Sequence, residues 1–149
     1  MADQKITSVK AFIDLVLSKP SNEHLKCVIG KVSDIEVSII KKLSDIDLTG
    51  YVRIIDSYGI KHAIAKHGNL ITEIKRGQLP ITTNDLSFIP IIVNNPDGLV
   101  YDGKNSIGRD IFVYRKNIDG VIFYVEEVRT KRKEVVLQTM YKKKAPKFP

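Results

Sequence analysis

The sequence predicts an α+β domain in which N-terminal helices pack on a C-terminal antiparallel β-meander. Two observations support this fold class. Apolar residues recur with helical spacing in the first half of the chain, and the last third holds three β-rich segments separated by turn residues. With 149 residues, of which 43% are hydrophobic and 28% charged, the chain is long enough to bury a sizeable core in a single domain.

Helices are predicted where apolar periodicity coincides with capping residues. Helical spacing covers Thr7–Lys19 and ends at a proline. A capping box opens a second helix over Ser33–Leu43, and the segment between the two, Leu25–Val32, is consistent with a short strand. A third helix is predicted over Ser57–His67, where an aspartate can cap its start and a glycine can close it. Thr83–Leu86 resembles one short capped turn.

The meander is predicted from Asp110–Lys116, Val121–Arg129 and Lys133–Lys142. Side chains alternate across a strand, so two-residue loops would fix which residues share a face. With such loops, one face carries an apolar set expected to pack on the helices: Val121, Phe123, Val125, Val136 and Met140. The other face then carries the polar set Arg115, Tyr124, Glu126, Thr139 and Tyr141. Such a face is suited to a phosphodiester, although a solvated antiparallel face has the same composition.

Charge narrows the class of partner. The 24 Lys and Arg residues exceed the 17 Asp and Glu residues, which gives a net charge of +7 and a pI near 9.4. This balance favours an anionic partner, nucleic acid first, although many small basic domains are merely soluble. The single cysteine, Cys27, lies in an apolar run and is expected to be a small buried side chain. We expect no metal and no cofactor, because no His/Cys ligand spacing is present, and a cytoplasmic protein without membrane contact.

The predicted third helix carries two of the three histidines, His62 and His67. Imidazole is the usual general acid or base near neutral pH. Cleavage of RNA through its own 2′-hydroxyl needs a base, an acid for the leaving oxygen and positive charge for the phosphorane. Five positions place the two side chains about 140° apart on a regular helix, so His67 must sit where the helix unwinds, or only one imidazole acts. We expect at least one of them to lie over Thr139 and Tyr141.

Five segments together resemble a known family: Gly50–Arg53, Ile60–Gly68, Ile81–Leu86, Tyr124–Arg129 and Leu137–Lys142. They resemble phage-associated nuclease domains classed with barnase, EndoU, colicin-type tRNases and RelE, here called BECR-like. The resemblance covers residues 50–144. It implies a BECR-like RNase fold and metal-independent endoribonuclease activity that leaves a 2′,3′-cyclic phosphate.

The resemblance also implies roles for individual residues. EndoU-like members use two histidines, a basic residue, and a Ser or Thr shortly before a Tyr near the C-terminus. The catalytic set carried over to this chain is His62, His67, Thr139 and Tyr141, with Arg115 or Arg129, or Lys142 after Tyr141, as the basic residue. The expected substrate-binding set is Lys66, Tyr124, Glu126, Arg132, Lys142 and Lys143.

The expected organisation is an N-terminal helical segment (1–46) packed on the same domain, a nuclease domain (47–144) and a basic tail (145–149). RNA is the expected partner. Because such a nuclease is toxic, an acidic immunity or antitoxin protein is a second expected partner, and association with a phage particle is plausible. One alternative is a non-enzymatic nucleic-acid-binding or phage structural module. Another is an ADP-ribosyltransferase-like enzyme, suggested only by Glu126-Glu127 near Arg129, without a glycine-rich dinucleotide loop.

Overall fold

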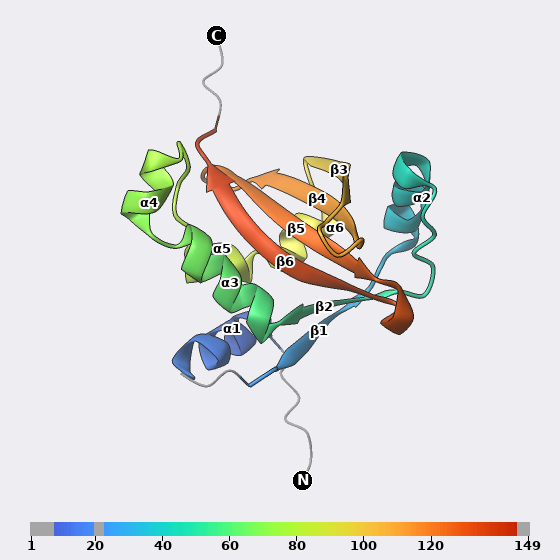
Figure 1. Cartoon of the computed structure of the whole chain (residues 1–149), viewed down its shortest axis with the longest axis horizontal. Helices are drawn as coiled ribbons and strands as arrows, with labels where there is room; N and C mark the ends of the chain where they lie inside the picture. The colour runs from blue at the N-terminus through green and yellow to red at the C-terminus, as the bar shows by residue number, and fades with distance from the viewer. Residues whose placement is uncertain (1–7, 20–22, 146–149) are drawn as a thin grey trace.

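The computed structural model describes residues 8–19 and 23–145, and helices cover one face of a six-stranded sheet (Figure 1). Within these residues the helices are α1 (Val9–Ser18), α2 (Asp34–Ser44), α3 (Ser57–His67), α4 (Leu70–Lys75), α5 (Thr83–Ser87) and α6 (Ile89–Asn94). The strands are β1 (Lys26–Lys31), β2 (Val52–Asp56), β3 (Gly98–Lys104), β4 (Asp110–Asn117), β5 (Val121–Arg129) and β6 (Glu134–Lys143). A 3-10 turn, η1 (Thr130–Arg132), joins β5 to β6. The predicted basic tail lies outside the described residues, apart from its first residue.

The sheet has the order β1-β2-β6-β5-β4-β3. Only β2 and β6 run parallel; the other neighbours are antiparallel, so the C-terminal meander extends into a mixed sheet through β2. This arrangement confirms the predicted α+β class. No helix among the described residues is both long and apolar enough to cross a membrane.

The elements predicted from local patterns agree with the structure. The α3 helix has the predicted bounds, and its N-cap is Asp56, whose carboxylate accepts from the Gly59 amide. The capping box before α2 is present, with Ser33 and Glu36 bonded reciprocally. Cys27 is buried in the core, as expected. The elements not predicted are β3, α4 and α6, which lie in a stretch interrupted by prolines and glycines. For Tyr51–Ile55, before α3, the sequence allows a strand or an extended loop, and the structure has β2 there.

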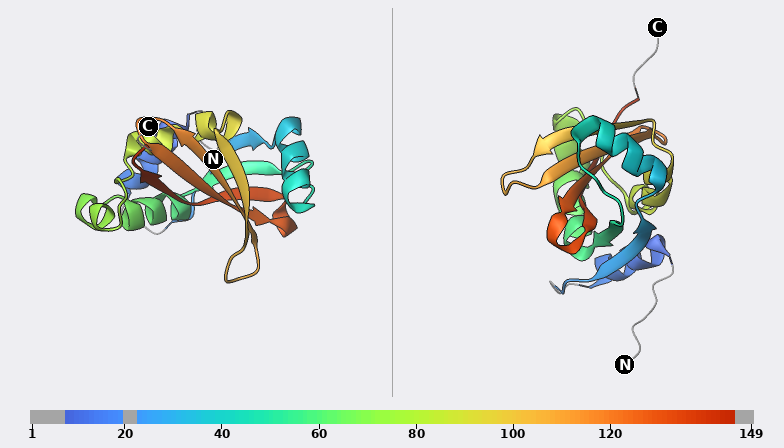
Figure 2. Two further views of the ribbon diagram at one scale, coloured as in Figure 1. Left: turned by 90° about the horizontal axis from the view of Figure 1, so that it is seen from above. Right: turned by 90° about the vertical axis from the view of Figure 1, so that its right-hand side faces the viewer.

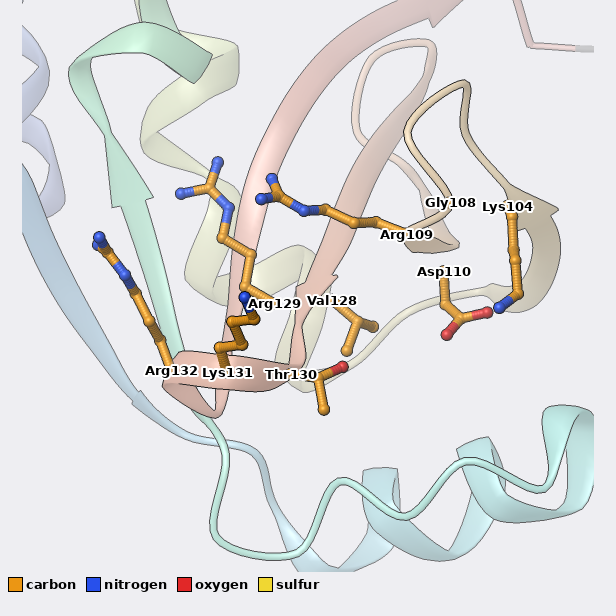
Figure 3. Close-up of a pocket in the computed structure, with 9 residues that line it drawn as sticks. All are labelled: Lys104, Gly108, Arg109, Asp110, Val128, Arg129, Thr130, Lys131 and Arg132. Atoms are coloured by element: carbon orange, nitrogen blue, oxygen red, sulfur yellow. The ribbon is translucent and has the colours of Figure 1, made fainter.

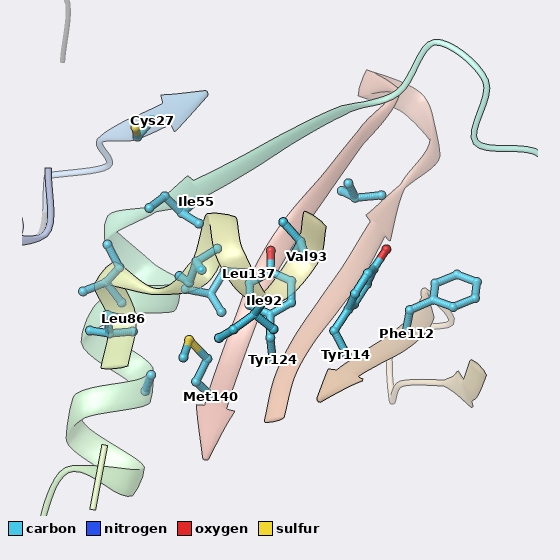
Figure 4. Packing of buried hydrophobic residues seen from close by; sticks show 14 of the residues in the cluster. Cys27, Ile55, Leu86, Ile92, Val93, Phe112, Tyr114, Tyr124, Leu137 and Met140 are labelled. Carbon is cyan, nitrogen blue, oxygen red and sulfur yellow. The ribbon is translucent and has the colours of Figure 1, made fainter. Parts of the chain in front are cut away.

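The two faces of the sheet differ in what covers them. Helices α1, α2, α5 and α6 lie on one face, here called the covered face, and the turn between β3 and β4 projects from the other, the open face (Figure 2). On the covered face, Tyr124, Met140 and Ile92 belong to one large apolar cluster that also includes residues of α1 and α3 (Figure 4). On the open face a smaller cluster holds Ile111, Val113 and Val125, flanked by Phe123 and Tyr141.

The predicted grouping of side chains by face was wrong in part, because the loops and the register differ from those assumed. Three residues separate β4 from β5, since Asn117 pairs with Val121, and four separate β5 from β6, since Arg129 pairs with Glu134. Glu126 does pair with Leu137, but a β-bulge at Gln138 then shifts the register by one residue. A bulge adds one residue to one strand and so reverses the facing beyond it.

The correction divides the predicted polar set between the two faces. Arg115, Thr139 and Tyr141 share the open face with Phe123 and Val125. Tyr124 and Glu126 lie on the covered face and are fully buried, and Met140 lies there too. The expected helix-packed set was therefore mostly assigned to the wrong side.

A buried polar network occupies the covered face where β2, β4 and β5 meet α2. The Arg53 guanidinium donates through Nε to Glu126 Oε1 at 2.6 Å and through Nη2 to Glu36 Oε2 at 2.6 Å. The Tyr114 hydroxyl donates to Glu36 at 2.7 Å, and the Tyr124 hydroxyl donates to Glu126 at 3.2 Å. Burial opposes the charge of the guanidinium, but Glu126 and Glu36 outweigh it and hold the pKa of Arg53 above its ordinary value.

Candidate active site

The open face carries a cavity of about 230 Å³ between the start of α3 and strands β5 and β6. We call it the Arg129 pocket. Its lining combines imidazole, guanidinium, carboxylate and amide groups, from Asp56, Tyr58, Gly59, His62, Glu127, Arg129, Leu137 and Gln138. It contains one predicted histidine and one of the two predicted arginines.

Local sequence explains why α3 places His62 at this pocket. The helix begins directly after β2 at its Asp56 cap, and it packs along β6. The approach is close at Gly59, where any side chain would collide with the Leu137 carbonyl oxygen. Tyr58 and His62, one turn apart, therefore both line the pocket beside Gln138.

A chain of polar contacts runs from the segment before β1 to the pocket floor. His24 Nε2 lies 3.0 Å from Asp56 Oδ2, and the imidazole stacks on the Tyr58 ring at 4.4 Å between centroids. Asp56 is almost fully buried, and Arg129 Nη1 lies 3.8 Å from its Oδ2. Because a carboxylate only accepts, Nε2 of His24 is the donor in this contact.

Glu127 positions two guanidinium groups. Its Oε1 accepts from Arg129 Nε at 3.0 Å and from Arg109 Nη1 at 2.8 Å, and its Oε2 accepts from the Asn105 amide at 2.8 Å. Burial alone would raise the pKa of Glu127, but the bonds from Arg129 and Arg109 lower it below its ordinary value. Glu127 is therefore ionised and orients both arginines.

His62 is exposed at the pocket rim and is electrostatically poised to accept a proton. Partial desolvation, followed by the positive charges of Lys66 and His67, lowers its pKa below the ordinary 6.5. At neutral pH its imidazole is therefore uncharged, the form that a general base needs.

The second predicted histidine lies at the other end of the open face. His67 contacts Tyr141 at 5.8 Å between ring centroids, so one predicted imidazole lies beside the tyrosine of the final hairpin. Tyr141 stacks on Phe123 at 4.7 Å, and Lys143 Nζ lies over both rings. We call these four residues the aromatic cluster. His67 Nδ1 also lies 3.2 Å from Glu73, whose carboxylate is fully buried.

Thr139 lies between the pocket and the aromatic cluster. Within the described part of the chain, its Oγ1 and the neighbouring Gln138 Oε1 are buried polar atoms without a hydrogen-bond partner. Buried polar atoms are normally hydrogen-bonded, so these two are exceptions. Of the two residues, Gln138 lines the Arg129 pocket and Thr139 does not.

The remaining predicted residues are dispersed. Lys66 is exposed on α3, Arg132 is exposed in η1, and the Arg115 guanidinium lies over Gly98, toward the β3 edge of the sheet. Lys142 does not face the site: it is buried on the covered face, where its Nζ contacts Asp85 at 3.2 Å. Tyr124 and Glu126 belong to the Arg53 network and present no side chain to a substrate.

The same facing removes the basis for the transferase alternative. Successive residues of a strand point to opposite faces, so Glu126 is buried against Arg53, whereas Glu127 holds the arginines of the open face. The two carboxylates do not act as a pair. Across the described residues, no cluster of three His, Cys, Asp or Glu side chains is arranged to hold a metal ion.

Sequence reasoning missed His24, Asp56, Glu127 and Gln138. His24 lies in a polar loop, 32 positions from the aspartate that it contacts, so no local spacing in the sequence points to it. Asp56 was recognised only as a helix cap. The signal that was available is the order of residues at the end of β2, where an aspartate at a strand end precedes a helix that carries histidines.

The α+β fold and the open face, with imidazole, guanidinium and hydroxyl groups around one cavity, define a small domain equipped for phosphodiester chemistry. The chain belongs to the family described as phage-Barnase-EndoU-ColicinE5/D-RelE like nuclease3, whose sequence model matches residues 30–148. This match confirms the predicted resemblance and supports a nuclease function. Searches of curated proteins and of solved structures found no match. The matched region includes α2 and all of β2–β6 but begins after His24.

Proposed function

We propose that the protein is an endoribonuclease that cleaves RNA through the substrate's own 2′-hydroxyl without using a metal ion. The proposal rests on one observation: His62, an uncharged imidazole, lines the same pocket as the Arg129 guanidinium. The guanidinium is held in place by its hydrogen bond to Glu127. A base and a fixed positive charge around one cavity are what this reaction requires.

In the proposed reaction His62 accepts the proton of the 2′-hydroxyl. The 2′-oxygen forms a bond to phosphorus, and the bond from phosphorus to the 5′-oxygen breaks. His24, oriented by Asp56, donates a proton to the departing 5′-oxygen. The products are a 2′,3′-cyclic phosphate and a free 5′-hydroxyl, so no water or metal enters this step.

Arg129 is the proposed stabiliser of the pentacoordinate phosphorane. Guanidinium groups bind phosphate oxygens bidentately, and a group held in place in advance loses little freedom when the transition state forms. Gln138, whose amide oxygen has no hydrogen-bond partner among the described residues, lines the same pocket and is the proposed polar contact for the substrate. Arg115 is the weaker candidate for this role, because it lies over Gly98, away from the pocket.

The aromatic cluster is the proposed contact for the neighbouring nucleotide. Tyr141 and Phe123 provide a stacked apolar surface, and Lys143 above them supplies positive charge. Base stacking on such rings tolerates different sequences. In this assignment His67 supports Tyr141 and is itself fixed by Glu73.

The pKa of His62 makes the pH dependence of cleavage testable. Because His62 must be uncharged, kcat/KM should fall with acid through an apparent pKa below 6.5. Lys66→Gln removes a charge that lowers this pKa, so the acid limb should move to higher pH. Rate profiles between about pH 5 and 8 measure the shift. Lys42→Gln on α2, an equal charge change on an exposed residue elsewhere in the fold, should leave the limb in place. An unchanged limb in Lys66→Gln would argue against His62 as the base.

The proposal is tested by incubating the purified protein with mixed tRNA, rRNA and mRNA in EDTA and determining the ends of the products. We expect cleavage with 2′,3′-cyclic phosphate ends and none of the matching DNA, which lacks the attacking hydroxyl. Arg129→Gln should lower kcat/KM by about 10²–10³, the usual cost of one transition-state donor. Arg115→Gln, an equal change on the same face, should stay close to wild type.

Three outcomes contradict the proposal. Cleavage that stops in EDTA places a metal in the reaction, and equal cleavage of DNA removes the 2′-hydroxyl from it. No cleavage of any RNA, with binding retained, leaves the non-enzymatic nucleic-acid-binding module as the function.

A further inference from the structure

We propose that a second cavity, next to the Arg129 pocket, is a binding subsite for a backbone phosphate that flanks the cleaved one. The inference rests on the proposed function, because it specifies how the same nuclease holds its substrate. The cavity measures about 490 Å³, and we call it the basic pocket. It lies between the β3–β4 turn, the end of β5 and the η1 turn, and is lined by Lys104, Gly108, Arg109, Asp110, Val128, Arg129, Thr130, Lys131 and Arg132 (Figure 3).

The charge of this lining is strongly one-sided. Five of the nine residues are Lys or Arg, and the one carboxylate, Asp110, accepts a hydrogen bond from the Tyr101 hydroxyl at 2.7 Å. Among the described residues, no carboxylate lies within ion-pair distance of Lys104, Lys131 or Arg132. Unpaired cations gathered around a cavity favour an anion, and a cavity of this kind concentrates its attraction.

The basic pocket and the Arg129 pocket are neighbours that share a lining residue. Arg129 lines both cavities, and Figure 3 shows the guanidinium groups of Arg109 and Arg129 side by side. Both donate to Glu127 Oε1, so one carboxylate aligns a cation from each cavity. Consecutive phosphates of one strand can therefore occupy the two cavities with a shared arginine between them.

A polynucleotide backbone fits this arrangement better than a small anion. Polar donors of several kinds line the pocket, including the Thr130 hydroxyl and the backbone at Gly108, whose φ of +82° reflects the tight turn after β3. The pocket lacks an exposed aromatic ring for stacking a base. It is thus suited to phosphate and sugar contacts, which position a strand without reading its sequence.

The test compares substrates with one phosphate and with several. In Lys104→Gln/Lys131→Gln, kcat/KM for an RNA oligonucleotide of several residues should fall by about tenfold or more at low salt, and its salt dependence should flatten by about 0.7 per lost contact. Cleavage of a dinucleoside monophosphate, which cannot reach the basic pocket, should be unchanged. The matched control, Lys41→Gln/Lys42→Gln on α2, removes two exposed lysines elsewhere and should alter neither substrate.

An equal loss on both substrates, or no loss on either, overturns the subsite. Failure of the proposed nuclease is distinguished by binding: if no RNA is cleaved, fluorescence anisotropy with 2′-deoxy oligonucleotides of increasing length makes the same comparison without catalysis. The double variant should then lose affinity for the longer strands only. Equal affinity of wild type and variant at every length rejects the subsite whether or not the protein is an enzyme.

Discussion

Replacing His62 with alanine is expected to lower kcat/KM for RNA cleavage by about 10²–10⁴, the usual contribution of a general acid or base. At about 1.36 kcal/mol per factor of ten, this corresponds to a loss of about 3–5 kcal/mol of transition-state stabilisation. The fold should survive, because His62 is exposed and none of the described hydrogen bonds involves its ring. Steady-state kinetics on a defined oligonucleotide, with thermal unfolding of the same sample, measure both effects.

A comparison of variants at His24 and His67 tests which histidine is the general acid that protonates the leaving 5′-oxygen. If His24 is the general acid, His24→Gln should cost about as much as His62→Ala, because Asp56 contacts both this imidazole and the Arg129 guanidinium. His67→Ala should cost far less in kcat, since that ring is bonded to Glu73 and packed on Tyr141. A large loss from His67→Ala with no loss from His24→Gln would transfer the acid role to His67.

Replacing Arg53 with methionine is expected to destabilise the fold by about 3–5 kcal/mol, the usual cost of removing one partner from a buried ionic cluster. The substitution leaves Glu36 and Glu126 buried in the core without their cation, and Tyr114 loses a neighbour. For a chain of this length each kcal/mol lowers Tm by about 2–4 °C, so a fall on the order of 10 °C is expected. Chemical denaturation and thermal scans measure it.

Neutralising the two glutamates of the Arg53 network should restore stability to the Arg53→Met variant. Adding Glu36→Gln and Glu126→Gln to Arg53→Met removes the stranded charges, and a glutamine at position 36 can still complete the capping box. The triple variant should recover a large part of the lost stability. Arg115→Met, which removes an exposed arginine, should stay within about 0.5 kcal/mol of wild type. A triple variant no more stable than Arg53→Met would show that the loss comes from packing and not from unpaired charge.

Part of the candidate site could be predicted from residue types and their spacing in the sequence. Histidines on a short helix, an arginine at the end of a strand, and a Thr-x-Tyr in the last strand were all singled out, and the structure places His62 with Arg129 and His67 with Tyr141. The roles of the orienting carboxylates, Asp56 and Glu127, could not be predicted from the sequence. In the sequence, Asp56 looks like a helix cap and Glu127 like a hairpin charge; only the fold shows which side chains each of them contacts.

The main error of the sequence-based prediction was the assignment of strand side chains to the two faces of the sheet. A single residue in β6 caused it. One extra residue, Gln138, moves Thr139 and Tyr141 to the side opposite Tyr124 and Glu126. A bulge of one residue leaves almost no trace in hydrophobic patterning when both faces of the bulged strand carry apolar residues, as β6 does with Val135 and Val136.

For most of the helices and strands, the amino-acid sequence alone determined the type and many of the bounds, because helical and strand periodicity, capping boxes and turn residues act over a few neighbouring positions. Membership of a nuclease family also followed from sequence. The tertiary structure alone decided which side chains share a face and which distant groups meet, such as Arg53 with Glu126, 73 positions apart. The physical reason is that burial and charge pairing depend on contacts between segments that are distant in the sequence. Those contacts form only when the strands have paired in their final register.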